Sequence, residues 1–296
     1  MELLLRDVRL ATEIAGTRVT YPASETSSRG RCVGIGVMAD GSGAAVLLDS
    51  TAAHPRSPTW PDQPADRGVL RAPDGREHPL SDVRQGVVVD GELVLDTTAA
   101  RAGGVEVVVH LIPPADIEIG DEVEVLVDVD FRRALSLAHS ACHLASFALN
   151  AAVAQLWNKP VQRMDALGHP AFDPLAIQSS TMSPYRAVDA YRLGKSLRKK
   201  GFDVARLDVD LPAVTRQLRS RLSRWVAADS ALSLDAGDGT LSARRSWSCR
   251  LDGIDVVMAC GGTHPTSAGE LAGIDSTLEL SSERDELTMT TTVPRR

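Results

Sequence analysis

The feature that most constrains the fold is a segment without glycine or proline, residues 132–157. It reads RRALSLAHSACHLASFALNAAVAQLW and is rich in Ala and Leu. Glycine and proline are the residues that most weaken a helix interior, so their absence over this length favours one continuous helix. The sequence therefore predicts a long helix here, stopped by Pro160.

The chain before this helix has a different character. It consists of short β-branched runs separated by Gly, Asp and Pro, namely CVGIGVMA, AAVLLD, GVVVDGELVLDTT, VEVVVHLI and DEVEVLVDVD. Runs of this length and spacing indicate a small barrel or a sandwich. We therefore expect residues 1–127 to form a small β-barrel domain. The proline-rich stretch TAAHPRSPTWPDQPADRG within it is expected to be a loop.

Residues 128–296 mix helical and strand signals. LPAVTRQLRSRLSRWVAAD has a proline near its start and helical apolar spacing, whereas SCRLDGIDVVMA is typical of a hairpin with an Asp-Gly turn. STLELSSERDELTMTTTV predicts two closing strands, and LGHPAFDPLAIQSSTMSPYR an irregular or edge segment. The second domain is therefore expected to be α+β.

Composition limits the class of protein. Hydrophobic residues make up 43% and charged residues 24% of the 296 residues, as in a soluble globular protein. The sequence contains no run of 18 apolar residues, so it predicts no membrane-spanning helix. The apolar part of MELLLRDVRL is too short for the hydrophobic region of a signal peptide. Four scattered cysteines are too few for a disulfide framework. We therefore expect reduced thiols, a cytoplasmic protein and no membrane partner.

The charge is unevenly distributed. The net charge of −7 argues against a general nucleic-acid coat and gives no reason to expect DNA binding. Residues 186–224 nevertheless carry eleven Lys or Arg and only four Asp. Such a cluster is either a solvated helical face or a surface that contacts phosphates.

Two histidines on the predicted long helix point to a metal site. His139 and His143 are four residues apart, so both imidazoles emerge on one face of the helix, about one turn apart. Cys260 and His264 lie on either side of two glycines, in a turn that can aim both side chains at one centre. Three nitrogens and one sulfur form a tetrahedral set that suits Zn²⁺.

Both motifs resemble those of a known family. RRALSLAHSACHLASFALN and CGGTHPTSAGELAGI are similar to the editing domain of alanyl-tRNA synthetases and of stand-alone alanyl-tRNA editing proteins, a domain shared with threonyl-tRNA synthetases. The resemblance covers roughly residues 40–290. It implies a zinc ion held by His139, His143, Cys260 and His264, and an α+β editing domain of the second-additional-domain type.

The resemblance also implies an activity. It predicts a trans-editing hydrolase that cuts the ester between a wrong amino acid and the 3′ end of tRNA, for example seryl or glycyl esters on tRNA(Ala). A metal at this site would polarise a carbonyl or activate water, provided that its coordination can open. Four protein ligands are otherwise typical of a structural zinc.

The sequence departs from the family in two places. The glycine-rich motif HPxGGGQPxDxG is replaced by HPRSPTWPDQPADRG, which keeps His54, Pro55, Gln63, Pro64, Asp66 and Gly68 but loses the three glycines. Residues 159–210 also match the family poorly. The altered loop leaves the choice of aminoacyl group open.

Further residues receive candidate roles. Ser140 and Thr263 flank metal ligands and are candidates to orient water or substrate, although such hydroxyls are more often bonded to backbone. His54 and Gln63 are candidate substrate contacts. The candidate tRNA contacts are Lys195, Arg198, Lys199 and Lys200. His78, His110 and His169 have no partner at ligand spacing and are expected on the surface or in turns.

Two other functions stay open. One is a metal-dependent hydrolase of the same fold that acts on a small aminoacyl ester or amide, which the altered loop favours. The other is a non-catalytic, zinc-containing RNA-binding module, which a closed set of four ligands favours. The oligomeric state does not follow from the sequence.

Overall fold

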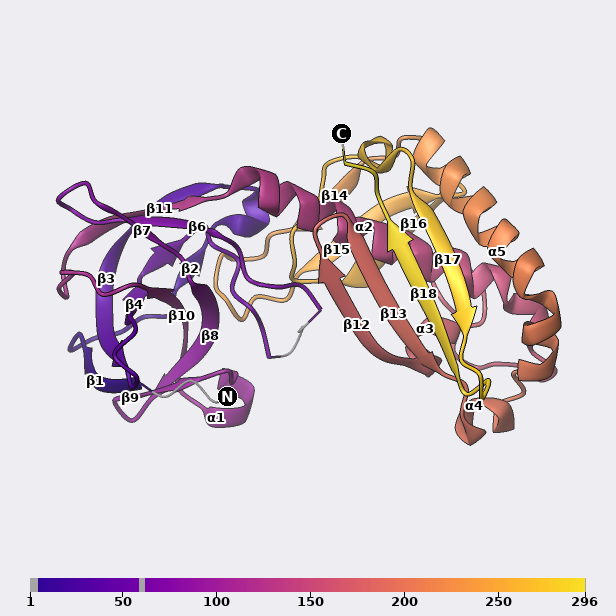
Figure 1. The fold of residues 1–296 in the computed structure, drawn as a ribbon, viewed down its shortest axis with the longest axis horizontal. Coiled ribbons are helices and arrows are strands. Elements are labelled where there is room, and N and C mark those ends of the chain that lie inside the picture. Colours follow the sequence, from indigo (N-terminus) through magenta and orange to yellow (C-terminus); the bar gives the residue numbers. More distant parts are fainter. Residues whose placement is uncertain (1–4, 59–61, 296) are drawn as a thin grey trace. The chain divides into compact units, whose positions relative to one another are not determined.

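The computed structural model describes residues 5–58 and 62–295, and its chain divides into two compact units (Figure 1). The first unit comprises residues 1–132 with the short segments 234–246 and 260–263. The second comprises residues 133–233, 247–259 and 264–296. The fold is mixed α and β, and sheet predominates.

The first unit is built on a nine-stranded sheet. Its strands are β1 (Leu5–Leu10), β3 (Ser27–Met38), β4 (Ala44–Leu48), β6 (Gly68–Arg71), β7 (Glu77–Pro79), β8 (Asp82–Val89), β9 (Glu92–Leu95), β10 (Val105–Ile112) and β11 (Glu122–Val127). Their order is β7-β6-β11-β3-β4-β10-β8-β9, and β1 also pairs with β3. The remaining elements are β2 (Arg18–Val19), β5 (Ser50–Thr51), the 3₁₀ turn η1 (Tyr21–Ala23) and α1 (Ala99–Ala102).

The closed barrel expected from the sequence is wrong. Among the described strands the path ends at β7 and β9, which do not pair with each other. These edge strands have only three and four residues, so they close hairpins and offer little length for further pairing. Strand β3 changes partners along its length: residues 27–31 pair with β11 and residues 32–37 with β4. A register shift against β4 lies between Cys32 and Gly34.

Both faces of this sheet are covered. Val46 and Leu48 of β4 join one apolar cluster, whereas Ala45 and Leu47 join another. Successive side chains of a strand point to opposite faces, so a strand buried on both faces reads as a continuous apolar run. This is the physical reason for the sequence AAVLL in β4.

The second unit combines helices with two smaller sheets. Its elements are α2 (Val129–Ala152), η2 (Ala154–Leu156), α3 (Phe172–Ala176), β12 (Ile177–Ser183), β13 (Arg186–Arg192), α4 (Lys195–Lys199), α5 (Val204–Ala227), β14 (Leu232–Asp235), β15 (Ser246–Leu251), β16 (Ile254–Ala259), η3 (Ala268–Leu271), β17 (Asp275–Leu280) and β18 (Glu286–Thr292). One sheet has the order β12-β13-β18-β17, and the other β14-β15-β16. Helix α5 runs along β17 (Figure 1).

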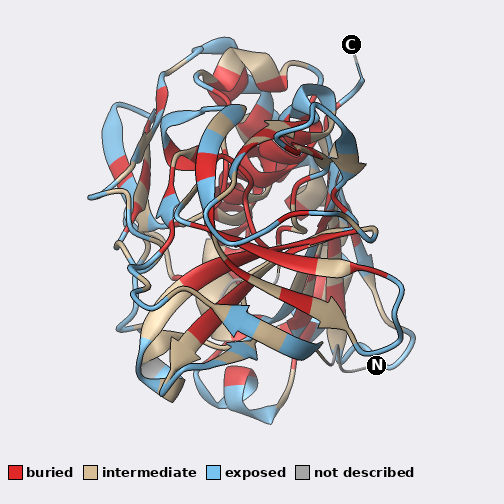
Figure 2. Ribbon diagram, turned by 90° about the vertical axis from the view of Figure 1, so that its left-hand side faces the viewer, coloured by how far each residue is buried: buried red, intermediate tan, exposed pale blue. Residues whose placement is uncertain are grey.

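The predicted long helix is present as α2, which begins at Val129 and ends at Ala152. Its predicted end at Trp157, before Pro160, is wrong, because the chain leaves the α-helix after Ala152 and forms the separate 3₁₀ turn η2. Most of the small and branched residues of α2 are buried, including Ala138, Ala141 and Leu144 at 0% exposure. In Figure 2, which is coloured by burial, long helical stretches are red while many strands alternate between red and blue. A helix buried on most sides needs small apolar residues, because they allow its neighbours to approach closely.

Two sequence expectations are refined by the second unit. Helix α5 was expected to start near Pro212 but begins eight residues earlier, because the side chain of Asp203 caps it by accepting a hydrogen bond from Arg206 N. The Asp-Gly hairpin is confirmed: Asp252 and Gly253 have φ values of 50° and 83° between β15 and β16. Strand β16 ends at Ala259, directly before Cys260.

No described helix has the length and apolarity needed to span a membrane. All four cysteines are free thiols.

Candidate metal centre

Helix α2 supplies the first two candidate ligands. His139 and His143 are 3% and 8% exposed, and their ring centroids are 4.6 Å apart. Positions four apart in a helix lie on one face, which is why the two imidazoles emerge side by side. The spacing in the sequence therefore predicted this pair correctly.

The chain returns to these histidines after β16. The ring of His264 lies 4.4 Å from that of His139 and 5.2 Å from that of His143, measured between centroids. Cys260 precedes His264 by four residues, so the local path of the chain brings the thiol to the same place. The four ligand atoms, one from each side chain, all lie within 4.8 Å of one another.

The donor set fits a zinc ion. Zinc bonds of about 2.0–2.3 Å to nitrogen and sulfur place tetrahedral ligand atoms roughly 3.5 Å apart. Ligand atoms already gathered within 4.8 Å reach that spacing through small side-chain movements. Soft sulfur combined with imidazole nitrogen favours zinc over the hard cations that prefer oxygen.

Burial controls the protonation of the cysteine. Desolvation raises the pKa of the Cys260 thiol to about 12, partly offset by a backbone hydrogen bond at Gly262, while the negative charge of Asp62 raises it further. The isolated side chain is therefore a neutral thiol at pH 7. Metal ligation requires the thiolate, so binding of zinc at this site entails the loss of a proton.

A tryptophan lines the cluster. Trp247 of β15 is fully buried, and its ring lies 5.1 Å from His143 and 6.1 Å from His264. Sequence reasoning missed this residue, because no spacing rule connects position 247 to the histidines. Its ring is part of the apolar surroundings of the candidate ligands, and such surroundings influence solvent access at metal sites.

Ser140 contacts His264, one of the candidate metal ligands. Its Oγ lies 2.9 Å from Nδ1 of His264. A hydrogen bond to one ring nitrogen helps to orient the imidazole of a candidate metal ligand. The structure thus places Ser140 beside the site, as expected, and gives its hydroxyl a ligand as partner.

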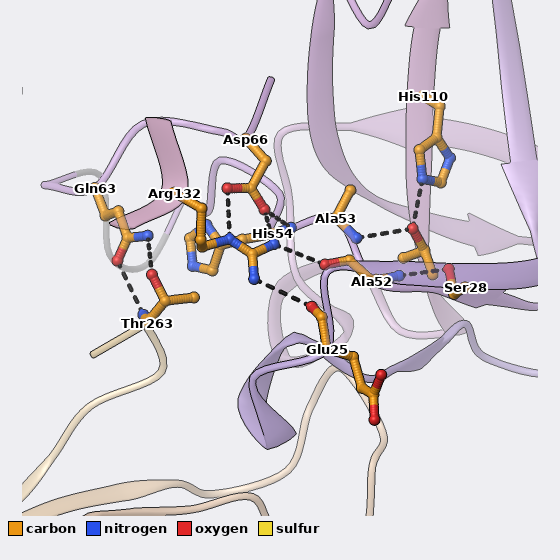
Figure 3. Close-up of polar contacts among 11 residues, drawn as sticks. Glu25, Ser28, Ala52, Ala53, His54, Gln63, Asp66, His110, Arg132 and Thr263 are labelled. Carbon is orange, nitrogen blue, oxygen red and sulfur yellow. Dashed lines mark hydrogen bonds and ion pairs between the residues drawn. The ribbon is translucent and has the colours of Figure 1, made fainter. Parts of the chain in front are cut away.

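Gln63 holds the turn that follows Cys260. Its Nε2 donates to Oγ1 of Thr263 at 3.0 Å, and its Oε1 accepts from the backbone N–H of Thr263 at 3.2 Å (Figure 3). Both side chains are buried. The two candidate site residues Gln63 and Thr263 therefore bind each other, at the residue directly before His264.

His54 lies in the interior of the first unit. It is 5% exposed, and its ring packs edge-on against Tyr21 at 4.8 Å. Burial, with the nearby positive charges of Arg132 and Arg245, lowers the pKa of His54 to about 3, so the ring is neutral. Its backbone N–H donates to Asp66 (Figure 3).

Asp66 also anchors the first turn of α2. Its carboxylate accepts from Nε of Arg132 at 2.7 Å and from Nη2 of the same guanidinium. Arg132 donates in addition to the carbonyls of Ala52 and Glu25 (Figure 3). Through these contacts Asp66 joins the backbone of His54 to the start of α2. The inserted Thr59, Trp60 and Pro61 lie outside the described residues.

The remaining candidates lie elsewhere. Lys195, Arg198, Lys199 and Lys200 are all exposed, on α4 and directly after it. The expectation that His110 is a surface residue is wrong. This residue of β10 is fully buried, with Nε2 2.8 Å from Oγ1 of Thr51 and Nδ1 3.1 Å from the carbonyl of Val46.

In a comparison with known proteins, part of the chain is similar in sequence to an enzyme. It is 33% identical over 122 residues to an alanine–tRNA ligase from Frankia alni. The match covers 41% of this chain but only 12% of the ligase. No family model matches the chain.

Proposed function

We propose that this protein is a zinc-dependent hydrolase that removes wrong amino acids from tRNA in trans, with an editing domain of the alanyl-tRNA synthetase type. The observation that carries the proposal is the buried convergence of His139, His143, Cys260 and His264. The similarity to an alanine–tRNA ligase supports tRNA as the partner. Seryl and glycyl esters of tRNA(Ala) are the proposed substrates.

The chain's own residues would prepare the site. His139, His143, Cys260 and His264 would hold zinc, which when bound supplies Lewis acidity toward a carbonyl oxygen or a water molecule. Ser140 helps to orient the imidazole of His264 through Nδ1. Gln63 fixes the backbone of Thr263, and the ring of Trp247 is part of the apolar surroundings. An aminoacyl ester is activated, so hydrolysis requires little beyond a positioned nucleophile and a polarised carbonyl.

A deacylation assay tests this proposal. Purified protein is incubated with tRNA(Ala) charged with serine, glycine or alanine, and release of free amino acid is followed over time. We expect rapid release of serine or glycine, slow release of alanine, and no release by His139→Ala. A protein that binds zinc and hydrolyses none of these esters would exclude the deacylase.

Two further measurements separate the alternatives. Hydrolysis of a small aminoacyl ester without turnover of any charged tRNA would favour the small-substrate hydrolase. The set of four protein ligands favours a structural zinc, and removal of the metal tests that possibility. A structural site should lose its fold with the metal, whereas the proposed catalytic site should lose turnover and keep most of its secondary structure.

A further inference from the structure

The basic stretch 186–224 separates into two parts in the second unit. One part belongs to the long helix α5. The other belongs to the end of β13, to α4 and to the residue that follows α4. The two parts differ in what their cations contact, and this difference distinguishes a solvated face from a binding surface.

The arginines of α5 are largely neutralised by neighbouring carboxylates. Four of its five arginines form ion pairs: Arg206 with Asp210 at 3.2 Å, Arg219 with Asp275 at 2.7 Å, Arg221 with Asp252 at 3.3 Å, and Arg224 with Asp252 at 2.8 Å. Arg216 is the exception. A cation already paired with a carboxylate gains little from an added phosphate, because the first pair must be given up.

The cations around α4 have no such partners. They are all exposed, and we call them the α4 face: Lys159, Arg192, Lys195, Arg198, Lys199 and Lys200. Residues 190–202 contain no Asp or Glu. Within the described part of the chain, no member of the α4 face forms an ion pair. Arg198 donates to the carbonyls of Leu193 and Arg284, and Lys159 to that of Lys199.

A groove runs through this face. It has a volume of about 850 Å³, and Arg192, Lys195 and Arg198 contribute to its walls. Apolar side chains such as Leu175 and Ile177 also line it, and Asp285 is the one carboxylate in the lining. That carboxylate accepts a hydrogen bond from Ser281 Oγ at 2.8 Å. The groove therefore keeps an excess of positive charge.

The lining also limits the kind of partner. The residues that line the groove include no aromatic side chain. Proteins that hold unpaired bases stack them on aromatic rings, whereas lysines and arginines alone contact the phosphate backbone. The α4 face is thus suited to a nucleic acid whose bases are paired and whose phosphates point outward, such as a helical stem.

We propose that the α4 face binds the phosphate backbone of a helical stem of tRNA, which makes it a docking surface separate from the metal ligands. The proposal rests on the proposed function for the choice of tRNA over other polyanions. Because the contacts are electrostatic, binding releases counterions, and its strength falls with salt concentration.

A pair of matched variants tests the surface. The first, Lys195→Ala/Lys199→Ala/Lys200→Ala, removes three unpaired cations. The control, Arg219→Ala/Arg221→Ala/Arg224→Ala, removes three ion-paired cations and changes the net charge equally. Binding of fluorescent, uncharged tRNA is followed by anisotropy at several salt concentrations. Zinc content and circular dichroism confirm that each variant is folded.

We expect the first variant to bind about 100-fold more weakly at ~0.1 M salt, with the slope of log affinity against log salt reduced by about 2 to 3. The control should change affinity by less than about threefold. Equal losses in the two variants, or a normal slope in the first, would overturn the proposal. Tighter binding of the wild type to single-stranded RNA than to a duplex stem would also overturn it. So would a first variant that binds tRNA normally but no longer binds vesicles of anionic lipid.

The outcome is independent of catalysis, because uncharged tRNA is the probe. If the wild type binds tRNA through the α4 face but hydrolyses no charged tRNA, the surface stands and the proposed function falls. If the wild type hydrolyses charged tRNA and the first variant binds as tightly as the wild type, the surface falls and the proposed function stands.

Discussion

Both units bury histidines, but in different ways. In the first unit His110 stands apart from other histidines and has a protein partner for each ring nitrogen: Val46 O accepts from Nδ1–H, and Nε2 accepts from the hydroxyl of Thr51. In the second unit, the imidazoles of His139, His143 and His264 lie within 5.2 Å of one another.

The difference shows that burial alone does not identify a functional histidine. Burial lowers the pKa of His110 to about 4, and the ring is simply a neutral, hydrogen-bonded part of the core. Three imidazoles gathered in one place offer several nitrogen donors to one partner. The thiol of Cys260 adds a sulfur donor, so the four side chains could bind a soft metal ion.

The largest expected effect is the loss of metal from the candidate metal centre. Cys260→Ala and His143→Ala each remove one ligand, so we expect zinc to fall from about one ion per chain to nearly none after dialysis. Elemental analysis of protein purified without chelators measures this. Cys249→Ala is the matched control, since it removes another buried cysteine and should keep its zinc. Full zinc content in both ligand variants would refute the assignment.

A smaller effect is expected from the residue that orients His264. Ser140→Ala removes the hydrogen bond to Nδ1, and loss of such a partner typically weakens metal affinity about 10- to 100-fold. Competition with a chromogenic chelator gives the affinity, and Ser223→Ala on the exposed side of α5 is the control. Unchanged zinc affinity with slower deacylation would instead indicate that Ser140 orients water or substrate.

Loss of the hydrogen bonds between Gln63 and Thr263 should weaken zinc binding less. Gln63→Ala leaves the buried N–H of Thr263 without its acceptor, so we expect a loss of zinc affinity of less than about tenfold. Gln63→Glu keeps an acceptor for that N–H and should recover most of the affinity. If both variants bind zinc like the wild type but lose affinity for charged tRNA, Gln63 is a substrate contact.

A further effect, on stability rather than on metal binding, concerns the buried histidines of the first unit. Their pKa values, about 3 for His54 and about 4 for His110, lie below the ordinary value of 6.5. The unfolded chain therefore takes up protons below pH 6.5 that the folded chain does not. The stability that neutral rings provide is complete above pH 6.5 and is lost as the pH falls toward 4, by roughly 1 kcal/mol per pH unit for each histidine.

His110→Gln tests this linkage. It should lower stability at pH 7.5, because Thr51 and Val46 lose well-placed partners, yet make stability depend less on pH between 6.5 and 4. Urea unfolding followed by circular dichroism measures both changes, and His78→Gln, at a partly exposed position of β7, is the control. A slope as steep as that of the wild type would show that His110 does not carry the linkage.

Local patterns in the sequence determined several features of this protein. The lack of Gly and Pro over 132–157 determined α2, because helix propensity acts residue by residue. The i, i+4 spacing placed His139 and His143 on one face, and Asp252-Gly253 determined the hairpin that ends before Cys260. In each case the relevant neighbours lie within a few positions along the chain.

The tertiary structure decided the features that are formed by residues far apart in the sequence. The short β runs did not reveal that the sheet of the first unit stays open, because closure depends on how β7 and β9 end. Trp247 beside His143, and Gln63 bonded to Thr263, join residues about 100 and 200 positions apart. The sequence likewise showed eleven cations in one stretch, but only the positions of Asp252 and Asp275 distinguished the paired arginines of α5 from the unpaired cations of the α4 face. Local propensity cannot encode such pairings, because folding brings these groups together through the packing of whole elements.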